Sequence, residues 1–208
     1  MRTLSTVMIA SSVAFAPMRV HADDDARVRT SVEVDTSQVG ESGPVIQRRI
    51  RERSDVVALA GFRHFLALAH QRGDDAFGLT RIFDPAIQLA VWRRTPDPTI
   101  GNWLERNAGA LGCGFRQLIT PGQTPVLDTL PTGSGRDALA DDLAQLAEML
   151  AELLDAPAIG VRLEVIHKAM CPRLHVDRVG VRMLCTYRGP GTEWVEEQSI
   201  DRSRLGAA

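Results

Sequence analysis

The sequence is poor in aromatic residues and in cysteine. Phe, Trp and Tyr together make up 5% of the 208 residues, with a single tyrosine, and there are three cysteines. A small fold held together by disulfides normally carries more cysteines and an even number of them, so a disulfide framework is disfavoured. Reduced thiols or metal ligands fit better, and they favour the cytoplasm.

The sequence also lacks an excess of charge of one sign and a long apolar run. The 24 basic residues face 26 acidic ones, which gives no electrostatic argument for nucleic acid or for an anionic membrane as a partner. The apolar run at 56–69 is interrupted by Arg63 and His64, so no segment is long enough to span a bilayer. With 44% apolar and 24% charged residues, the composition predicts a soluble globular protein.

The N-terminal part of the chain predicts segments outside the main domain. A basic start, a short apolar stretch and small residues at Val20 and Ala22 resemble a secretory signal peptide over 1–22. The equal alternative is a mis-called start codon with Met18 as the initiator. A true signal peptide predicts a periplasmic protein, whereas a chain without a signal peptide is predicted to be cytoplasmic. Polar residues 23–43 predict a linker, and residues 44–78 a helical extension.

Hydrophobic periodicity predicts an α+β domain over residues 79–208. Five leucines form one helical stripe from 139 to 153, which predicts a helix at 135–155 with Ser134 and Asp137 as a capping box. Asp97 followed by Pro98 predicts the start of a second, short helix. Two-residue alternation predicts the strands, at 87–92, 111–119, 161–166 and 181–187.

The most distinctive stretch is 170–194, MCPRLHVDRVGVRMLCTYRGPGTEW. Side chains two apart on a strand point to the same side, so His175 and Asp177 are expected to project together. They supply two of the three ligands of a 2-His-1-carboxylate site, which leaves positions on Fe(II) open for a co-substrate and oxygen. Chance gives about 0.4 His-x-Asp pairs in this composition, so the pair alone is a weak signal. The alternative is a surface strand whose Asp177 pairs with Arg173 or Arg178.

Neighbouring residues add context to this pair. The strands around it suit a small antiparallel barrel, which encloses a site in its mouth. Arg182 is the candidate to bind a co-substrate carboxylate with its planar guanidinium, although a salt bridge with a neighbouring acid is the more ordinary use. Tyr187 and Trp194 are the expected pocket residues. Cys171 is a candidate metal ligand, and together with Cys185 it offers thiolates that favour zinc over iron.

The segment CPRLHVDRVGVRMLCTYRGPGTEW, with the upstream IFDPAIQLAVWRR, closely resembles an uncharacterised bacterial protein family of unknown function, some members of which are labelled succinylglutamate desuccinylase. The resemblance covers roughly residue 79 to the C-terminus. It implies an antiparallel double-stranded β-helix (a jelly-roll or cupin-like barrel) similar to Fe(II)/2-oxoglutarate-dependent oxygenases, with packing helices on one side. His175 and Asp177 match the first two metal ligands. The resemblance also implies a link to bacterial zinc or metal homeostasis, and it names no substrate.

The chain departs from this family after the metal-ligand pair. Family members continue past residue 206 into a segment with a further histidine, whereas no histidine follows His175 here. The resemblance therefore implies a barrel that is incomplete at the C-terminus and lacks its third ligand, for which His167 and Cys171 are the nearest substitutes.

Three functions stay open on the sequence: an Fe(II)/2-oxoglutarate-type oxygenase, a zinc-binding protein of metal homeostasis, and a barrel fragment without a metal. A hydrolase is disfavoured because the chain has no nucleophile elbow and no His-Glu-x-x-His motif. The sequence does not decide whether the protein is an enzyme or what its oligomeric state is.

Overall fold

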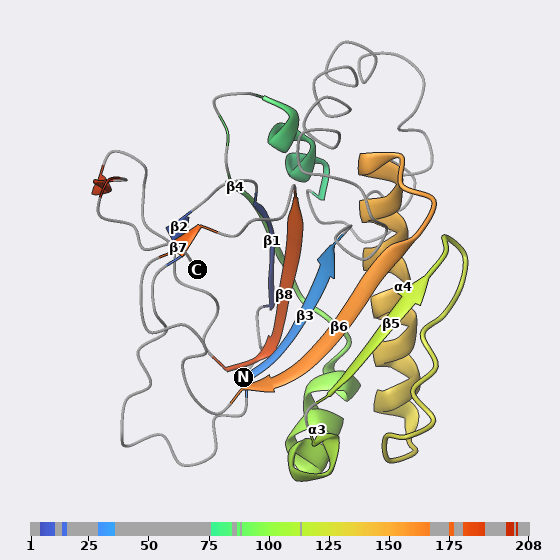
Figure 1. Ribbon diagram of the computed structural model, residues 1–208. Coiled ribbons are helices and arrows are strands. Elements are labelled where there is room, and N and C mark those ends of the chain that lie inside the picture. Colours follow the sequence, from blue (N-terminus) through green and yellow to red (C-terminus); the bar gives the residue numbers. More distant parts are fainter. Residues whose placement is uncertain are drawn as a thin grey trace.

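A computed structural model gives the chain a mixed α+β fold built on an open antiparallel sheet (Figure 1). It describes residues 76–84, 87, 89–112, 114–166, 181–189, 199–201 and 203, together with the backbone of 5–10, 14–15, 29–35 and 175–176. The sheet has six strands in the order β4-β1-β8-β3-β6-β5. Their bounds are β1 Ser5–Ala10, β3 Arg29–Asp35, β4 Leu89–Arg94, β5 Phe115–Ile119, β6 Ile159–Ile166 and β8 Arg182–Arg188.

Four helical segments accompany this sheet in the described part of the chain. They are the 3₁₀ helices η2 (Ala76–Phe83) and η3 (Ala108–Leu111) and the α-helices α3 (Pro98–Asn107) and α4 (Ser134–Leu154). A separate two-stranded sheet pairs β2 (Ala14–Phe15) with β7 (His175–Val176). Among the helices that the structure describes, none has the length and the apolar character that crossing a membrane requires.

Strands from the N-terminal part of the chain fill the middle of the sheet. β1 pairs antiparallel with β4 on one side and β8 on the other. β3 likewise lies between β8 and β6. Here the structure differs from the sequence prediction, because residues 29–35 belong to the segment expected to be a linker. The short alternation of Thr30, Val32 and Val34 with polar residues is the strand pattern that this expectation overlooked.

The expected double-stranded β-helix barrel is not confirmed. In the described part of the chain the sheet is open, and its end strands β4 and β5 each pair on one side only. The physical reason lies in the helices. Figure 1 shows α4 running behind β5 and β6, and helices packed on a sheet bury its apolar face without a second sheet.

The predicted long helix is confirmed as α4, but its predicted cap is wrong. All five leucines of the stripe are at most 1% exposed, and they form the centre of the core with the inward residues of β6 and β8. The N-cap is Gly133, and no side chain caps this end. Ser134 is already inside the helix, so it does not act as the cap of a capping box with Asp137.

The second predicted helix begins as expected, and it packs against α4. Asp97 Oδ1 accepts a hydrogen bond from the Thr99 amide at 2.8 Å, with Pro98 in the first turn. Gly135 lies at the contact between the two helices. A Cβ atom added there would lie 2.2 Å from Trp103 Cβ and 2.5 Å from Thr99 O, so only glycine allows this close approach.

The predicted strands are confirmed at β4, β5, β6 and β8, and the inward faces of β4 and β8 are now assigned. In β8 the buried face carries Met183, Cys185 and Tyr187. In β4 the buried face carries Trp92 and Arg94, whereas Val91 is 37% exposed. The alternating apolar residues Leu89 and Val91 therefore lie on the less buried face of the strand. The predicted helical extension up to residue 75 lies outside the described residues.

Candidate functional site

The predicted metal ligands fall mostly outside the part of the chain that the structure describes. His175 is placed by its backbone alone, in β7, opposite Phe15 of β2. Asp177, Cys171 and Trp194 lie outside the described residues, and so does the substitute ligand His167. Within the described ranges, no three His, Cys, Asp or Glu side chains gather as a metal site would require. The metal site therefore stays a prediction.

The structure does not bring the other two predicted site residues together. Tyr187 is buried, 2% exposed, and Arg182 at the start of β8 is half-buried. They are five residues apart in one strand, and an odd separation places side chains on opposite faces of a sheet. Tyr187 faces the core and Arg182 the other face, so they do not line one pocket.

A buried ion pair lies where β4, α4 and β8 meet. The Arg94 guanidinium donates through Nη1 to Asp142 Oδ1 at 2.6 Å and through Nη2 to Oδ2 at 2.5 Å. Arg94 is 2% exposed and Asp142 3%. A two-point contact between guanidinium and carboxylate is the strongest geometry of this pair, and its exclusion from water strengthens the attraction.

Side chains from β8 and β4 complete this Arg94–Asp142 cluster. Tyr187 donates its hydroxyl to Asp142 Oδ2 at 2.5 Å, and Arg94 Nη2 lies 3.2 Å from Cys185 Sγ. The Arg94 Cζ atom is 5.3 Å from the centre of the Trp92 ring and 5.8 Å from that of Tyr187, which adds cation–π attraction. Arg94 Nε and Trp92 Nε1 have no hydrogen-bond acceptor in the described part of the molecule.

The charge state of the cluster follows from burial and from these neighbours. Burial by itself lowers the pKa of Arg94, but Cys185, Asp142 and Tyr187 together outweigh it and raise that pKa above its ordinary value. Burial first, and then the negative charge of Asp142, raises the pKa of Tyr187 well above its ordinary value. The cluster is thus a charged Arg–Asp pair beside a neutral phenol. Its members are almost fully buried, which suits a role in holding three elements together better than acid–base catalysis.

Sequence reasoning missed this cluster, although two signals for it are present. Asp142 stands three residues after Leu139 and four before Leu146, on the apolar face of the long helix, where an acid needs a partner. Trp92 and Arg94 are two apart on a strand, so they share a face. Neither signal identifies Arg94 and Asp142 as partners of each other, because they are 48 residues apart in the chain.

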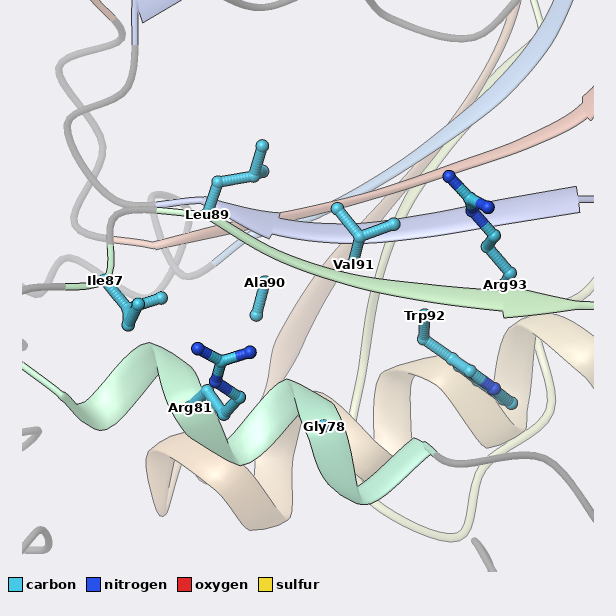
Figure 2. Close-up of a pocket in the computed structure, with 8 residues that line it drawn as sticks. All are labelled: Gly78, Arg81, Ile87, Leu89, Ala90, Val91, Trp92 and Arg93. Carbon is cyan, nitrogen blue, oxygen red and sulfur yellow. The ribbon is translucent and has the colours of Figure 1, made fainter. Parts of the chain in front are cut away.

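The described residues also line a pocket of about 620 Å³ between η2 and β4 (Figure 2). Figure 2 shows Ala90 and Trp92 on the side of β4 that faces η2, and Leu89, Val91 and Arg93 on its other side. The pocket therefore wraps around the outer edge of an end strand. Its described lining residues are Gly78, Arg81, Ile87, Leu89, Ala90, Val91, Trp92 and Arg93.

A comparison with protein families places this chain. The profile of a family described as a protein of unknown function, DUF1826, matches residues 73–208, more than half of the chain. The chain belongs to the DUF1826 family. The match includes the Arg94–Asp142 cluster, the pocket and the predicted metal ligands, while β1, β2 and β3 precede it. No curated protein and no solved structure matches the chain significantly.

DUF1826 membership confirms the resemblance to an uncharacterised family and leaves its finer parts open. The family description names no activity, so the desuccinylase label and the His-x-Asp barrel stay predictions. The matched segment supplies β4, β5, β6 and β8, and two of the sheet's inner strands come from outside it.

Proposed function

We propose that this DUF1826 protein binds a metal ion through His175 and Asp177, with Fe(II) as the metal and an oxygenase-like site around it. The observation that supports the proposal is the strand geometry of residues 175–176. Extended backbone continuing from β7 to Asp177 would place the two side chains on one side, which is what a His-x-Asp ligand pair requires. When bound, Fe(II) with open coordination positions supplies oxygen activation. The chain supplies the imidazole and the carboxylate that hold it.

The finer parts of the proposal concern the barrel and the co-substrate. The open sheet would be one wall of a double-stranded β-helix, since β4 and β5 end the sheet without a second described neighbour. Arg182 would bind a carboxylate of 2-oxoglutarate. Its half-buried position at the start of β8, five residues after Asp177, supports this role, because a guanidinium partly withdrawn from water binds a carboxylate more strongly.

Zinc is the second candidate metal, with Cys171 as a thiolate ligand. The position of Cys185, the other cysteine of the stretch 170–194, limits which thiolates could bind zinc. Cys185 is 1% exposed in the core and lies against Arg94 Nη2, which makes it a poor candidate for a zinc ligand. A zinc site would then depend on Cys171, whose thiolate prefers zinc to an oxygenase iron.

Metal content and a spectrum test the proposal. Purified protein loaded anaerobically with Fe(II) should develop a visible charge-transfer band when 2-oxoglutarate is added. His175→Ala should lose both the band and the bound metal, whereas His64→Ala, a control outside the predicted pair, should keep them. Stoichiometric zinc that disappears in Cys171→Ser would favour the zinc site. If His175→Ala alters neither metal content nor melting temperature, only the barrel fragment without a metal survives.

The proposed compartment is the cytoplasm, where Fe(II) and 2-oxoglutarate are available, with the periplasm as the alternative. Sequencing the N-terminus of the mature protein decides between them. A chain cleaved after residue 22 would lack β1, which pairs with both β4 and β8. Cleavage would therefore leave these two strands without their shared neighbour.

A further inference from the structure

We propose that the pocket between η2 and β4 binds an elongated organic dianion, two carboxylates joined by an apolar chain. The proposal does not depend on the predicted metal ligands, and none of them is among the described lining residues. It rests on two arginines, on the apolar wall between them and on the position of β4 at the edge of the sheet.

The first argument is charge. Arg81 of η2 and Arg93 of β4 are both exposed and both line the pocket. No described residue forms an ion pair or hydrogen bond with either guanidinium, whereas Arg94, Arg136 and Arg188 each have a carboxylate partner. The described lining contains no acidic residue. Two guanidiniums with no carboxylate partner among the described residues favour a ligand with two negative groups.

The second argument is the apolar surface between the two cations. Leu89 is half-buried and Val91 is 37% exposed, and Ile87 and Ala90 also line the pocket. A volume of about 620 Å³ lies in the range of small-molecule sites, which are mostly apolar with a few placed polar groups. An apolar ligand chain would cover this surface and gain from leaving water.

The third argument is spacing. Figure 2 shows Arg81 reaching from η2 toward β4 near Ala90, and Arg93 extending from the other side of the strand. Three residues of strand, from 90 to 93, span about 10 Å. A dianion with both charges on neighbouring carbons would meet one guanidinium only. The ligand therefore needs an apolar body long enough to separate its two carboxylates by a similar distance.

The edge position of β4 adds binding groups of a second kind. β4 pairs with β1 on one side, and no described strand pairs with its other side. Backbone amides and carbonyls on that outer side of an edge strand remain open to a partner. They can bind a carboxylate or an ordered water beside the arginines.

Calorimetric titration with nonanedioate, an extended nine-carbon dicarboxylate, tests the proposal. Nonanedioate should bind at least about tenfold more tightly than nonanoate, which has one carboxylate on the same chain. Arg81→Gln and Arg93→Gln should each weaken nonanedioate binding about tenfold and abolish its advantage over nonanoate. Arg116→Gln is the matched control, because Arg116 is an exposed arginine on β5, the opposite edge strand. Equal losses in all three variants would mean general charge attraction and would overturn the site, as would the absence of binding.

A steric variant tests the location without changing charge. Gly78 lines the pocket, and a Cβ atom added there meets nothing within 4 Å. Gly78→Phe should therefore fold normally and block nonanedioate. Gly101→Phe is the matched control, since Gly101 of α3 has equally open surroundings and does not line the pocket. Unchanged binding in a folded Gly78→Phe variant would place the ligand elsewhere and refute the proposal.

Discussion

Arg93 and Arg94 are neighbours in β4, yet their environments are opposite. Arg94 is 2% exposed and bound to Asp142, Cys185 and the rings of Trp92 and Tyr187. Arg93 is exposed, and no described residue pairs with it. The two differ because successive side chains of a strand point to opposite faces. One residue type thus serves two purposes, a fixed internal charge and an external charge available to a ligand.

The buried arginine should account for the largest effect on stability. Arg94→Met leaves Asp142 charged in the core without its two-point partner, which should lower the free energy of unfolding by about 3–5 kcal/mol. Urea unfolding followed by tryptophan fluorescence measures this loss. The double variant Arg94→Met/Asp142→Leu removes both charges, and it should recover most of the lost stability. A single variant as stable as the natural chain would refute the importance of the pair.

The hydroxyl of Tyr187 should have the next largest effect. It donates to a buried carboxylate at 2.5 Å, and hydrogen bonds to charged groups contribute about 1.5–3 kcal/mol. Tyr187→Phe keeps the ring against Arg94 and removes this bond alone, so stability should fall by about that amount in the same urea experiment. A change as large as that of Arg94→Met would mean that the ring has moved too.

The pH dependence of stability should report the same phenol. Burial and Asp142 raise the folded-state pKa of Tyr187 well above its unfolded value of 10.0. A raised pKa favours the protonated form, so this contribution to stability is complete below pH 10 and is lost as the pH rises above it. Tyr187 is the single tyrosine of the chain, so tyrosinate absorbance follows it alone. The absorbance should rise together with unfolding, and titration of Tyr187 near pH 10 in the folded protein would contradict the assignment.

The exposed arginine should have the smallest effect. Arg93→Gln changes a surface residue without a described partner, so the free energy of unfolding should change by less than about 0.5 kcal/mol. The comparison is sharpest when this variant and Arg94→Met are measured side by side. A substantial destabilisation by Arg93→Gln would mean that Arg93 also supports the fold, and it would weaken the case for a ligand-binding charge.

Local patterns predicted the α-helices α3 and α4 and the strands β4, β5, β6 and β8. The leucine stripe gives α4 its length and its buried face, and Asp97 with Pro98 gives α3 its start. Both signals act within a turn or two of helix, so no distant residue is needed to interpret them. The capping box failed because Gly133 is the N-cap and the helix already begins at Ser134, and a Ser–Asp spacing fits many starts equally well.

The candidate sites were less accessible to sequence reasoning. The metal-ligand pair came from a spacing and a resemblance, and most of it lies outside the described residues. The pocket combines Arg81 of η2 with Arg93 of β4, two arginines that look like ordinary surface charges in the sequence. The expected barrel rested on resemblance, whereas the order of strands depends on long-range pairing that no local pattern encodes.

By itself the sequence determined where α4 and α3 form and which side of β8 is apolar, because helix periodicity, capping and strand alternation are properties of adjacent residues. Tertiary structure alone decided that β1 and β3 enter the middle of the sheet and that Arg94, not Arg93, faces the core. It also joined Arg94 to Asp142 and Cys185, residues 48 and 91 positions away. Such contacts form only when distant segments pack together, since a buried charge is stable only beside the partner that the fold brings to it.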